Sequence, residues 1–343
     1  MRKLILILIS FALLGCNANS RKVAENLSFL AESESAAPDD VMTEAILGNF
    51  DADSAYYYLA KQVDFGPRVP NTEAHRLAGD WLVAELQRRG AKVIEQRAAL
   101  KAFDGTILNA RNIFARFPSE SDVNSQGGKA KNYDGLLLVA HYDSRPWADQ
   151  DPDPQKRKTP VDGANDGASG VAVLLEIARQ LAMNPINHPV DILLVDAEDW
   201  GEEGDDNSWA LGTKYFVENL PIKGYSPKGA ILLDMVGGQG ATFCREYFSE
   251  NSAPDLADRL WATAAKLGYG NIFLNKMGTA ILDDHVQLIR GGIPAIDIIE
   301  YHPDSENGFN SRWHTTADNL DGISKETLSA VGNTLMTFLI NQR

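Results

Sequence analysis

The sequence has little cysteine, an excess of acidic over basic residues, and no long apolar run. Its 343 residues include only Cys16 and Cys244, which excludes a disulfide framework and a zinc site built from several thiolates. Lysine and arginine number 32 against 47 acidic residues, a formal net charge of −15. Proteins that bind duplex nucleic acid usually carry a basic excess, so we expect no nucleic-acid partner. The 44% hydrophobic and 23% charged residues are typical of a globular protein rather than a disordered chain or a polytopic membrane protein.

The N-terminus has the pattern of an export signal, MRKLILILISFALLGC over residues 1–16. Two basic residues precede an apolar run at 4–14, which is shorter than the roughly 20 residues of a membrane-spanning helix. A buried helix is the alternative interpretation. The LLGC segment at 13–16 resembles the lipobox of bacterial lipoproteins. This resemblance implies removal of a signal peptide, residues 1–15, and lipidation of Cys16, whose acyl chains would anchor the protein to a membrane.

Residues 16–48 are therefore expected to form the lipidated cysteine and a flexible tether, because the segment is polar and poor in aromatic residues. We expect a protein of the bacterial cell envelope that faces the periplasm. The choice between inner and outer membrane stays open.

From residue 49 to 343 the pattern is that of a single α/β domain. Apolar periodicity predicts helices over 51–63, 72–89, 171–182 and 328–339. Strands are predicted at 92–96, 112–116, 135–140, 191–196, 230–234 and 294–299. The last four are continuous apolar runs, typical of strands buried on both faces. Their alternation with helices predicts a mainly parallel sheet flanked by helices on both faces.

Polar clusters follow or precede these apolar runs, at 141–144, 163–170, 196–200, 234, 283–285 and 313–315. Singly, each has an ordinary explanation: Asp166 as a helix N-cap, His141 as a structural histidine, the 198–199 pair as a solvated turn. Together they are expected to meet beyond the carboxyl ends of the strands. So many carboxylates in one place need a cation, and imidazole with carboxylate favours zinc.

In this order, the motifs HYD (141–143), GANDGASG (163–170), DAED (196–199), LLDMVG (232–237), DDH (283–285) and WHT (313–315) resemble the zinc aminopeptidase fold family. That family includes di-zinc aminopeptidases and the animal-type glutaminyl cyclases. The resemblance spans roughly residues 50–342 and implies a zinc-dependent catalytic domain with a central twisted mixed sheet.

The resemblance implies two sets of metal ligands. In di-zinc aminopeptidases one metal is held at the positions of His141, Asp166 and Asp234, and the other at those of Asp166, Asp199 and His314. Glutaminyl cyclases keep these positions but hold one zinc, in the second set. All five residues are present, so the ligands alone leave one or two zinc ions open.

Three features favour a cyclase. Asp283 matches an extra carboxylate that joins a network with the positions of Glu198 and Asp234 in the cyclases. Phe309 and Trp313 form the F-x-x-x-W-H pattern of the animal enzymes. The segments RPWAD (145–149) and DAEDWG (196–201) are most similar to the lipoprotein cyclases of Bacteroidetes-type bacteria. One residue departs from the animal pattern, which has glutamate at position 199.

The resemblance thus implies a glutaminyl-peptide cyclotransferase, which converts N-terminal glutamine of a peptide or protein to pyroglutamate and releases ammonia. One zinc would polarise the γ-carbonyl, Glu198 would shuttle the proton, and Asp234 and Asp283 would orient the amine. Asp283 has an alternative role as the N-cap of the following helix. The expected pocket walls are Trp313, Phe309, Trp200 and Trp209. Residues expected to hold a second metal, or to orient the ligands of the first, are His141, Asp143, Asp284 and His285.

Two other functions stay open. A di-zinc aminopeptidase would use Glu198 to activate a metal-bridging water and would release N-terminal residues. A non-catalytic anchored binding module would keep the fold without the chemistry. A structural role is also expected for His75, on a helix that we expect at the surface.

Overall fold

The computed structural model describes residues 49–117, 135–305 and 307–342, which belong to one compact unit, Ile46–Arg343. The predicted signal peptide, Cys16 and the whole of the tether lie outside the described residues. Among the described helices, none is both long and apolar enough to cross a membrane.

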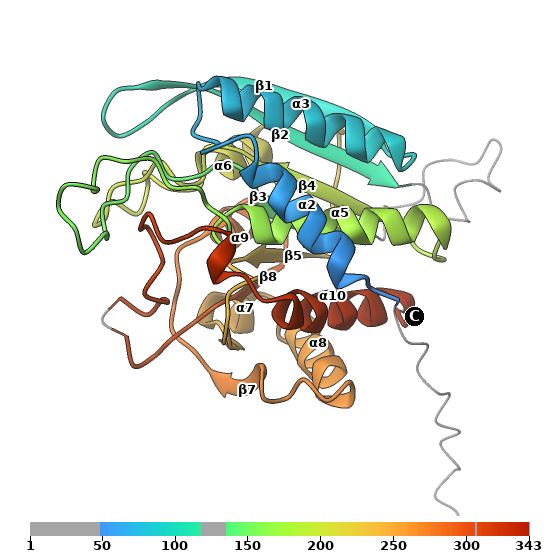
Figure 1. Ribbon diagram of the computed structural model, residues 1–343. Coiled ribbons are helices and arrows are strands. Elements are labelled where there is room, and N and C mark those ends of the chain that lie inside the picture. Colours follow the sequence, from blue (N-terminus) through green and yellow to red (C-terminus); the bar gives the residue numbers. More distant parts are fainter. Residues whose placement is uncertain (1–48, 118–134, 306, 343) are drawn as a thin grey trace, which may run out of the picture. The chain divides into compact units, whose positions relative to one another are not determined.

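A six-stranded sheet forms the centre of this unit (Figure 1). In spatial order its strands are β1 (Lys92–Lys101), β2 (Ile107–Phe117), β4 (Val190–Val195), β3 (Leu136–His141), β5 (Gly229–Asp234) and β8 (Ala295–Ile299). β1, β2 and β4 pair antiparallel, whereas β4, β3, β5 and β8 run parallel. The prediction of a mixed, mainly parallel sheet is therefore confirmed.

The four parallel strands are buried along their whole length, as their apolar runs predicted. Register stacks the side chains into layers: Leu138 of β3 lies opposite Ile192 of β4 and Ile231 of β5. These three belong to the core on one face of the sheet, and their neighbours, such as Leu137 and Leu193, belong to the core on the other.

Helices cover both faces. The larger core holds side chains of α2 (Ala52–Val63), α3 (Glu73–Arg88), α5 (Ala168–Met183), α8 (Pro254–Lys266) and α10 (Lys325–Ile340). The smaller core on the opposite face holds side chains of α6 (Leu211–Glu218) and α9 (Asp284–Arg290). The remaining elements are α7 (Tyr247–Ser252), the short helix η1 (Leu320–Gly322), and the small parallel pair β6 (Phe243–Arg245) and β7 (Phe273–Met277).

The predicted helix boundaries follow from local chemistry. The side chain of Thr72 accepts a hydrogen bond from the His75 amide and begins α3, and Gly90, at φ +84°, follows its last turn. The expectation for His75 itself was wrong in one respect. It lies on the buried face of α3, with Nε2 2.8 Å from Asp196 Oδ1 and its ring stacked on Tyr142. The role is structural, but the position is not at the surface.

The hairpin of β1 and β2 is longer than predicted: ten residue pairs join the two strands, and β1, whose positions are all exposed or intermediate, carries no apolar run that would mark its length. The helices α6, α7 and α8 and the β6–β7 pair were not predicted.

Candidate active site and metal centre

The predicted polar clusters meet at one edge of the sheet. Because β3, β4 and β5 run parallel, the residues at their carboxyl ends lie side by side. His141 ends β3, Asp234 ends β5, and Glu198 and Asp199 follow β4. Loops supply the other side chains that gather there: Asp166, Asp283 and His314.

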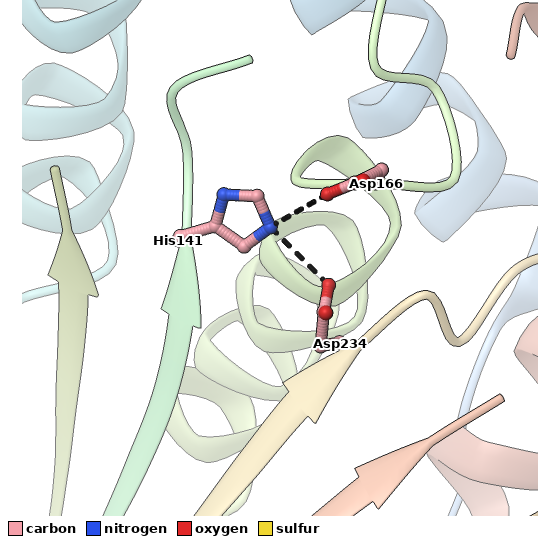
Figure 2. A group of neighbouring side chains, drawn as sticks. All are labelled: His141, Asp166 and Asp234. Carbon is pink, nitrogen blue, oxygen red and sulfur yellow. Dashed lines mark hydrogen bonds and ion pairs between the residues drawn. The ribbon is translucent and has the colours of Figure 1, made fainter. Parts of the chain in front are cut away.

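One group of metal-ligating side chains centres on His141 (Figure 2). Its Nε2 lies 3.1 Å from Asp166 Oδ1 and 3.2 Å from Asp234 Oδ1, so the ring points between the two carboxylates. All three side chains are buried. This is the first of the two ligand sets that the sequence predicted.

The second set is also present. His314 Nε2 lies 3.3 Å from Asp199 Oδ1 and 3.6 Å from Asp166 Oδ2, so Asp166 directs one oxygen to each group. Tetrahedral zinc with bonds of about 2.0–2.1 Å places its ligand atoms roughly 3.3 Å apart. Asp199 Oδ2 is buried with no hydrogen-bond partner in the structure, as expected of an atom that faces a metal. Both groups therefore fit zinc.

A third buried group lies apart from these two sets and consists of Asp283, His285 and Asp297. His285 Nε2 lies 3.0 Å from Glu246 Oε2, and its Nδ1 lies 3.4 Å from Asp297 Oδ2. His285 and Asp284 thus stand outside both predicted ligand sets. The expectation that these two residues hold a second metal, or orient the ligands of the first, therefore stays a prediction: His285 belongs to this third group, and Asp284 is buried next to it in the sequence.

Asp143 fixes the backbone of the loop that carries Glu198 and Asp199. Its two carboxylate oxygens accept hydrogen bonds from the backbone amides of Glu198 and Asp199, each at 3.2 Å. The loop that carries the proposed proton shuttle and a metal ligand is therefore held by a buried carboxylate. Asp143 orients ligands rather than joining either set.

Backbone strain is concentrated at this edge. Ala197, Met235 and His314 have φ values of +54°, +48° and +53°, a left-handed conformation that costs non-glycine residues of order 1–3 kcal/mol each. Ala197 immediately precedes Glu198, and Met235 immediately follows Asp234. His314 is itself one of the candidate metal ligands. Gly167 has φ +98°, and a Cβ there would lie 2.6 Å from the Asp143 carbonyl oxygen, so only glycine fits. The fold holds these side chains in place against a local cost.

The carboxylates have strongly shifted pKa values. Burial raises the pKa of Glu198 well above its usual value, and the nearby charges of Asp199 and Asp283 raise it further. Burial and Asp283 raise the pKa of Asp234 to about 7. Asp166 behaves differently: burial acts to raise its pKa, but the hydrogen bond and charge of His141, with the charges of His314 and Arg145, together lower it. Glu198, Asp234 and Asp283 thus form one coupled acidic group.

A cavity of about 440 Å³ opens over these residues. Its floor is acidic, with Asp166, Glu198, Asp199, Asp234 and Asp283, and His314 lies beside them. Its walls are aromatic and apolar, with Trp209, Ile281, Leu282, Tyr301, Phe309 and Trp313 among the lining residues. An acidic floor below apolar walls suits a ligand with a polar head and a less polar body.

The aromatic residues divide. Trp313 stacks on the ring of His314, with 3.7 Å between centroids, and Phe309 packs on Trp313 at 4.7 Å. Trp209 also lines the cavity, parallel to His314 at 6.1 Å. The expectation for Trp200 is not met: it is not among the lining residues, because it packs on Trp147 and donates its indole N–H to Asp104.

The two suspected helix caps have different outcomes. Asp166 is not an N-cap, since α5 begins after Gly167 with no side-chain cap. Asp283 is the N-cap of α9, accepting a hydrogen bond from the Asp284 amide, and it also lines the cavity. Its Oδ1 makes the cap, while Oδ2 is buried with no hydrogen-bond partner in the structure. One oxygen of this carboxylate therefore caps the helix, and the other is left without a hydrogen-bond partner at a residue that lines the cavity.

Several supporting residues were not predicted. Arg145 contacts Asp199, Asp149 faces His314, and Asp297 lies behind Asp283. Asp318 accepts the amides of Asn165 and Asp166 at 2.8 and 3.1 Å. A signal was available for Asp297, because it interrupts the apolar run 294–299 of a strand buried on both faces. No such local signal marks the others.

Comparison with known proteins agrees with this geometry. The family model of peptidase family M28 matches residues 123–339, which is more than half of the chain. The chain belongs to peptidase family M28. The predicted zinc aminopeptidase fold is therefore confirmed, and zinc is the metal that both ligand sets of this M28 protein fit.

Solved structures similar to this M28 protein include Porphyromonas gingivalis glutaminyl cyclase, 48% identical, with a TM-score of 0.81 over 86% of this chain and 100% of that one. Bacteroides thetaiotaomicron glutaminyl cyclase bound to N-acetylhistamine is 44% identical, with a TM-score of 0.81 over 87% and 100%. Among curated relatives, aminopeptidase YwaD of Bacillus subtilis is 27% identical over 78% of this chain and 52% of its own. The chain spans about half the length of the first curated relatives it matches. Glutaminyl-peptide cyclotransferases are more distant relatives.

Proposed function

We propose that the protein is a zinc-dependent glutaminyl-peptide cyclotransferase, which converts N-terminal glutamine of peptides and proteins to pyroglutamate and releases ammonia. The observation that carries this proposal is the position of Asp283. It lies in the cavity with Glu198 and Asp234 and raises the pKa of both. The similarity to bacterial glutaminyl cyclases at 44–48% identity supports the same activity.

The chemistry uses two groups of one substrate residue. The α-amine nitrogen forms a bond to the γ-carbonyl carbon, and the bond from that carbon to the amide nitrogen breaks. Glu198 accepts the proton that the amine loses and donates it to the leaving nitrogen, which departs as ammonia. The raised pKa of Glu198 suits both halves of this transfer, because it makes the carboxylate a better proton acceptor and keeps the acquired proton available for the leaving nitrogen.

The protein contributes mainly position. Asp234 and Asp283 lie beside Glu198 and would hold the amine, while Trp313, Phe309 and Trp209 would wall the folded glutamine side chain. Binding holds both reacting groups in attack geometry, so the loss of conformational freedom occurs on binding and does not add to the activation free energy of the chemical step. Zinc held by Asp166, Asp199 and His314 would supply a Lewis acid that polarises the γ-carbonyl.

We propose one zinc per chain, in the set of Asp166, Asp199 and His314, because all three of these residues line the cavity whereas His141 does not. A specific observation favours the alternative. The set of His141, Asp166 and Asp234 also has zinc spacing, and a second ion there would make a di-zinc aminopeptidase.

Turnover of a peptide with N-terminal glutamine, with ammonia and free amino acids both measured, separates these functions. Ammonia release with one tightly bound zinc supports the cyclase. Release of free N-terminal residues by a protein with two zinc ions would support the aminopeptidase. Inertness of zinc-loaded protein toward both kinds of substrate would leave a binding module.

We also propose that the protein is exported and lipid-anchored in the bacterial cell envelope, facing the periplasm, through Cys16. This rests on the export pattern of residues 1–16. Fractionation of cells that express wild type or Cys16→Ser tests it. Wild type is expected in the membrane fraction and the variant outside it, and equal distribution would contradict the anchor.

A further inference from the structure

A short segment after β3 contains an ion pair between a buried arginine and a partly buried aspartate that no step of the proposed reaction uses. The side chain of Arg145 is 2% exposed. Its Nε and Nη2 donate to the two oxygens of Asp149, at 2.9 and 2.7 Å, in a bidentate pair. Such planar, two-point contacts fix both side chains, and lysine does not reproduce them.

The remaining donor of Arg145 reaches a metal ligand. Its Nη1 lies 3.2 Å from Asp199 Oδ1, 3.1 Å from the Asp199 carbonyl and 3.3 Å from the Gly201 carbonyl. The guanidinium therefore holds both the side chain and the backbone of Asp199. This contact is important because aspartate has a shorter side chain than glutamate, so its backbone must be placed closer to a shared metal.

The other partner of the pair faces a second ligand. Asp149 Oδ1 lies 3.5 Å from His314 Nδ1, the ring nitrogen that points away from Asp166 and Asp199. The next residue, Gln150, donates its amide to the His314 carbonyl at 3.1 Å. A carboxylate at Nδ1 favours the tautomer in which Nε2 carries the lone pair that a metal needs.

Two tryptophan rings lie against the guanidinium of Arg145. The guanidinium carbon of Arg145 lies 5.3 Å from the ring centroid of Trp147 and 4.9 Å from that of Trp209. Trp209 lines the cavity beside His314. The Arg145 guanidinium is therefore shielded from water and in contact with a wall of the cavity, whereas Asp149 stays partly exposed.

We propose that Arg145 and Asp149 form a clamp that positions two zinc ligands, Asp199 and His314, from one segment of the chain. Neither residue is among those that line the cavity, so both are positioning residues. The inference rests on the proposed zinc set of Asp166, Asp199 and His314. It predicts that zinc affinity depends on two residues that are not themselves ligands.

Zinc affinity of the mature chain tests the clamp. Metal-free wild type, Arg145→Gln, Arg145→Lys, Asp149→Asn and the double variant Arg145→Gln/Asp149→Asn would be titrated with Zn²⁺ alone against a chromophoric chelator. The matched control is Arg111→Gln, because Arg111 is also a buried arginine that bridges two carboxylates, Asp80 and Glu95. Thermal unfolding with and without Zn²⁺ shows whether each variant is folded and how far zinc stabilises it.

We expect Arg145→Gln and Asp149→Asn each to raise the Kd for zinc about 10–100-fold, as is typical of residues that orient ligands. Arg145→Lys should lie between wild type and Arg145→Gln. The double variant should lose less zinc-binding free energy than the sum of the losses in the two single variants, because each single substitution already breaks the same ion pair. Arg111→Gln should bind zinc like wild type.

Folded Arg145→Gln and Asp149→Asn proteins with wild-type zinc affinity would overturn the clamp. Equal losses in Arg111→Gln would also overturn it, since the effect would then follow from any buried ion pair. A wild type that binds zinc but does not release ammonia would overturn only the proposed function. A wild type that binds no zinc would overturn both.

Discussion

The two ligand sets that share Asp166 have nearly the same side chains but different surroundings. The His314 set faces the cavity, with Trp313 stacked on the imidazole and a guanidinium against Asp199. His141, in contrast, is buried outside the cavity lining, and its charged neighbours are Asp143, Asp166 and Asp234. The residue types of the ligands do not distinguish these two sets. The Arg145 guanidinium and the tryptophan rings beside the His314 set do.

The difference shows how one fold can hold one zinc or two. The pKa of Asp234, in the His141 set, is about 7 because of burial and the nearby charge of Asp283, so near neutral pH a proton competes with a metal there. The pKa of Asp199, in the other set, is also raised, because burial and the charge of Asp166 outweigh the nearby His314 and Arg145.

The largest expected effect concerns Glu198, the proposed proton shuttle, which lies beside both ligand sets. Glu198→Gln should lower kcat for cyclisation of an N-terminal glutamine peptide by about 10²–10⁴-fold, because the proton shuttle is lost. Zinc content, measured by atomic absorption, should not change. Glu202→Gln, at an exposed position in the same loop, is the control and should keep wild-type rates. Full activity of Glu198→Gln would exclude the proposed mechanism.

The comparison is tested directly by removing one histidine from each set. His314→Ala should weaken zinc binding by more than the roughly 10–100-fold typical of a residue that only orients a ligand. His141→Ala should keep one zinc per chain with a smaller loss of affinity. Titration with a chelator measures both. Equal losses would show that the two sets are equivalent and would favour two metals.

The pH dependence of stability distinguishes the sets in metal-free protein. Asp234 and Asp318 have folded-state pKa values of about 7 and about 8, above the ordinary aspartate value of about 3.9. Between those values the folded state binds more protons, so the free energy of unfolding should fall as pH rises from about 4 to 8. Denaturant unfolding of wild type and Asp234→Asn measures it. In Asp234→Asn the decrease of the unfolding free energy with pH should be less steep, by up to about 1.4 kcal/mol per pH unit. An unchanged slope would argue against a raised pKa at Asp234.

The smallest expected effect concerns the rings. Trp313→Leu removes the stacking on His314 and Phe309 and should raise KM about 2–10-fold, since such contacts are worth about 0.5–1.5 kcal/mol. Trp200→Leu is the matched control, because Trp200 packs on Trp147 outside the cavity lining. Equal changes in both variants would mean that the effect on KM is not local to the cavity.

Much of the fold was predictable because its central strands are buried on both faces. Apolar runs mark β3, β4, β5 and β8 without ambiguity, and polar residues at their carboxyl ends mark the site. The short helices α6 and α7 and the β6–β7 pair carry too few residues for a periodic pattern. The site residues missed, such as Arg145 and Asp149, act through partners about 50 and 165 positions away, Asp199 and His314, and local patterns do not report such contacts.

The sequence by itself therefore determined the α/β class and the family, because these depend on apolar runs and on motifs at fixed places along the chain, and the resemblance of those motifs predicted two candidate sets of zinc ligands. Tertiary structure alone decided the surroundings of each set. It placed Trp209 in the cavity wall and Trp200 outside it, and moved His285 into a separate group with Glu246. It also brought the Arg145–Asp149 pair against two ligands. The physical reason is that electrostatic environment and ring packing depend on distances in space, which loops set and local sequence does not.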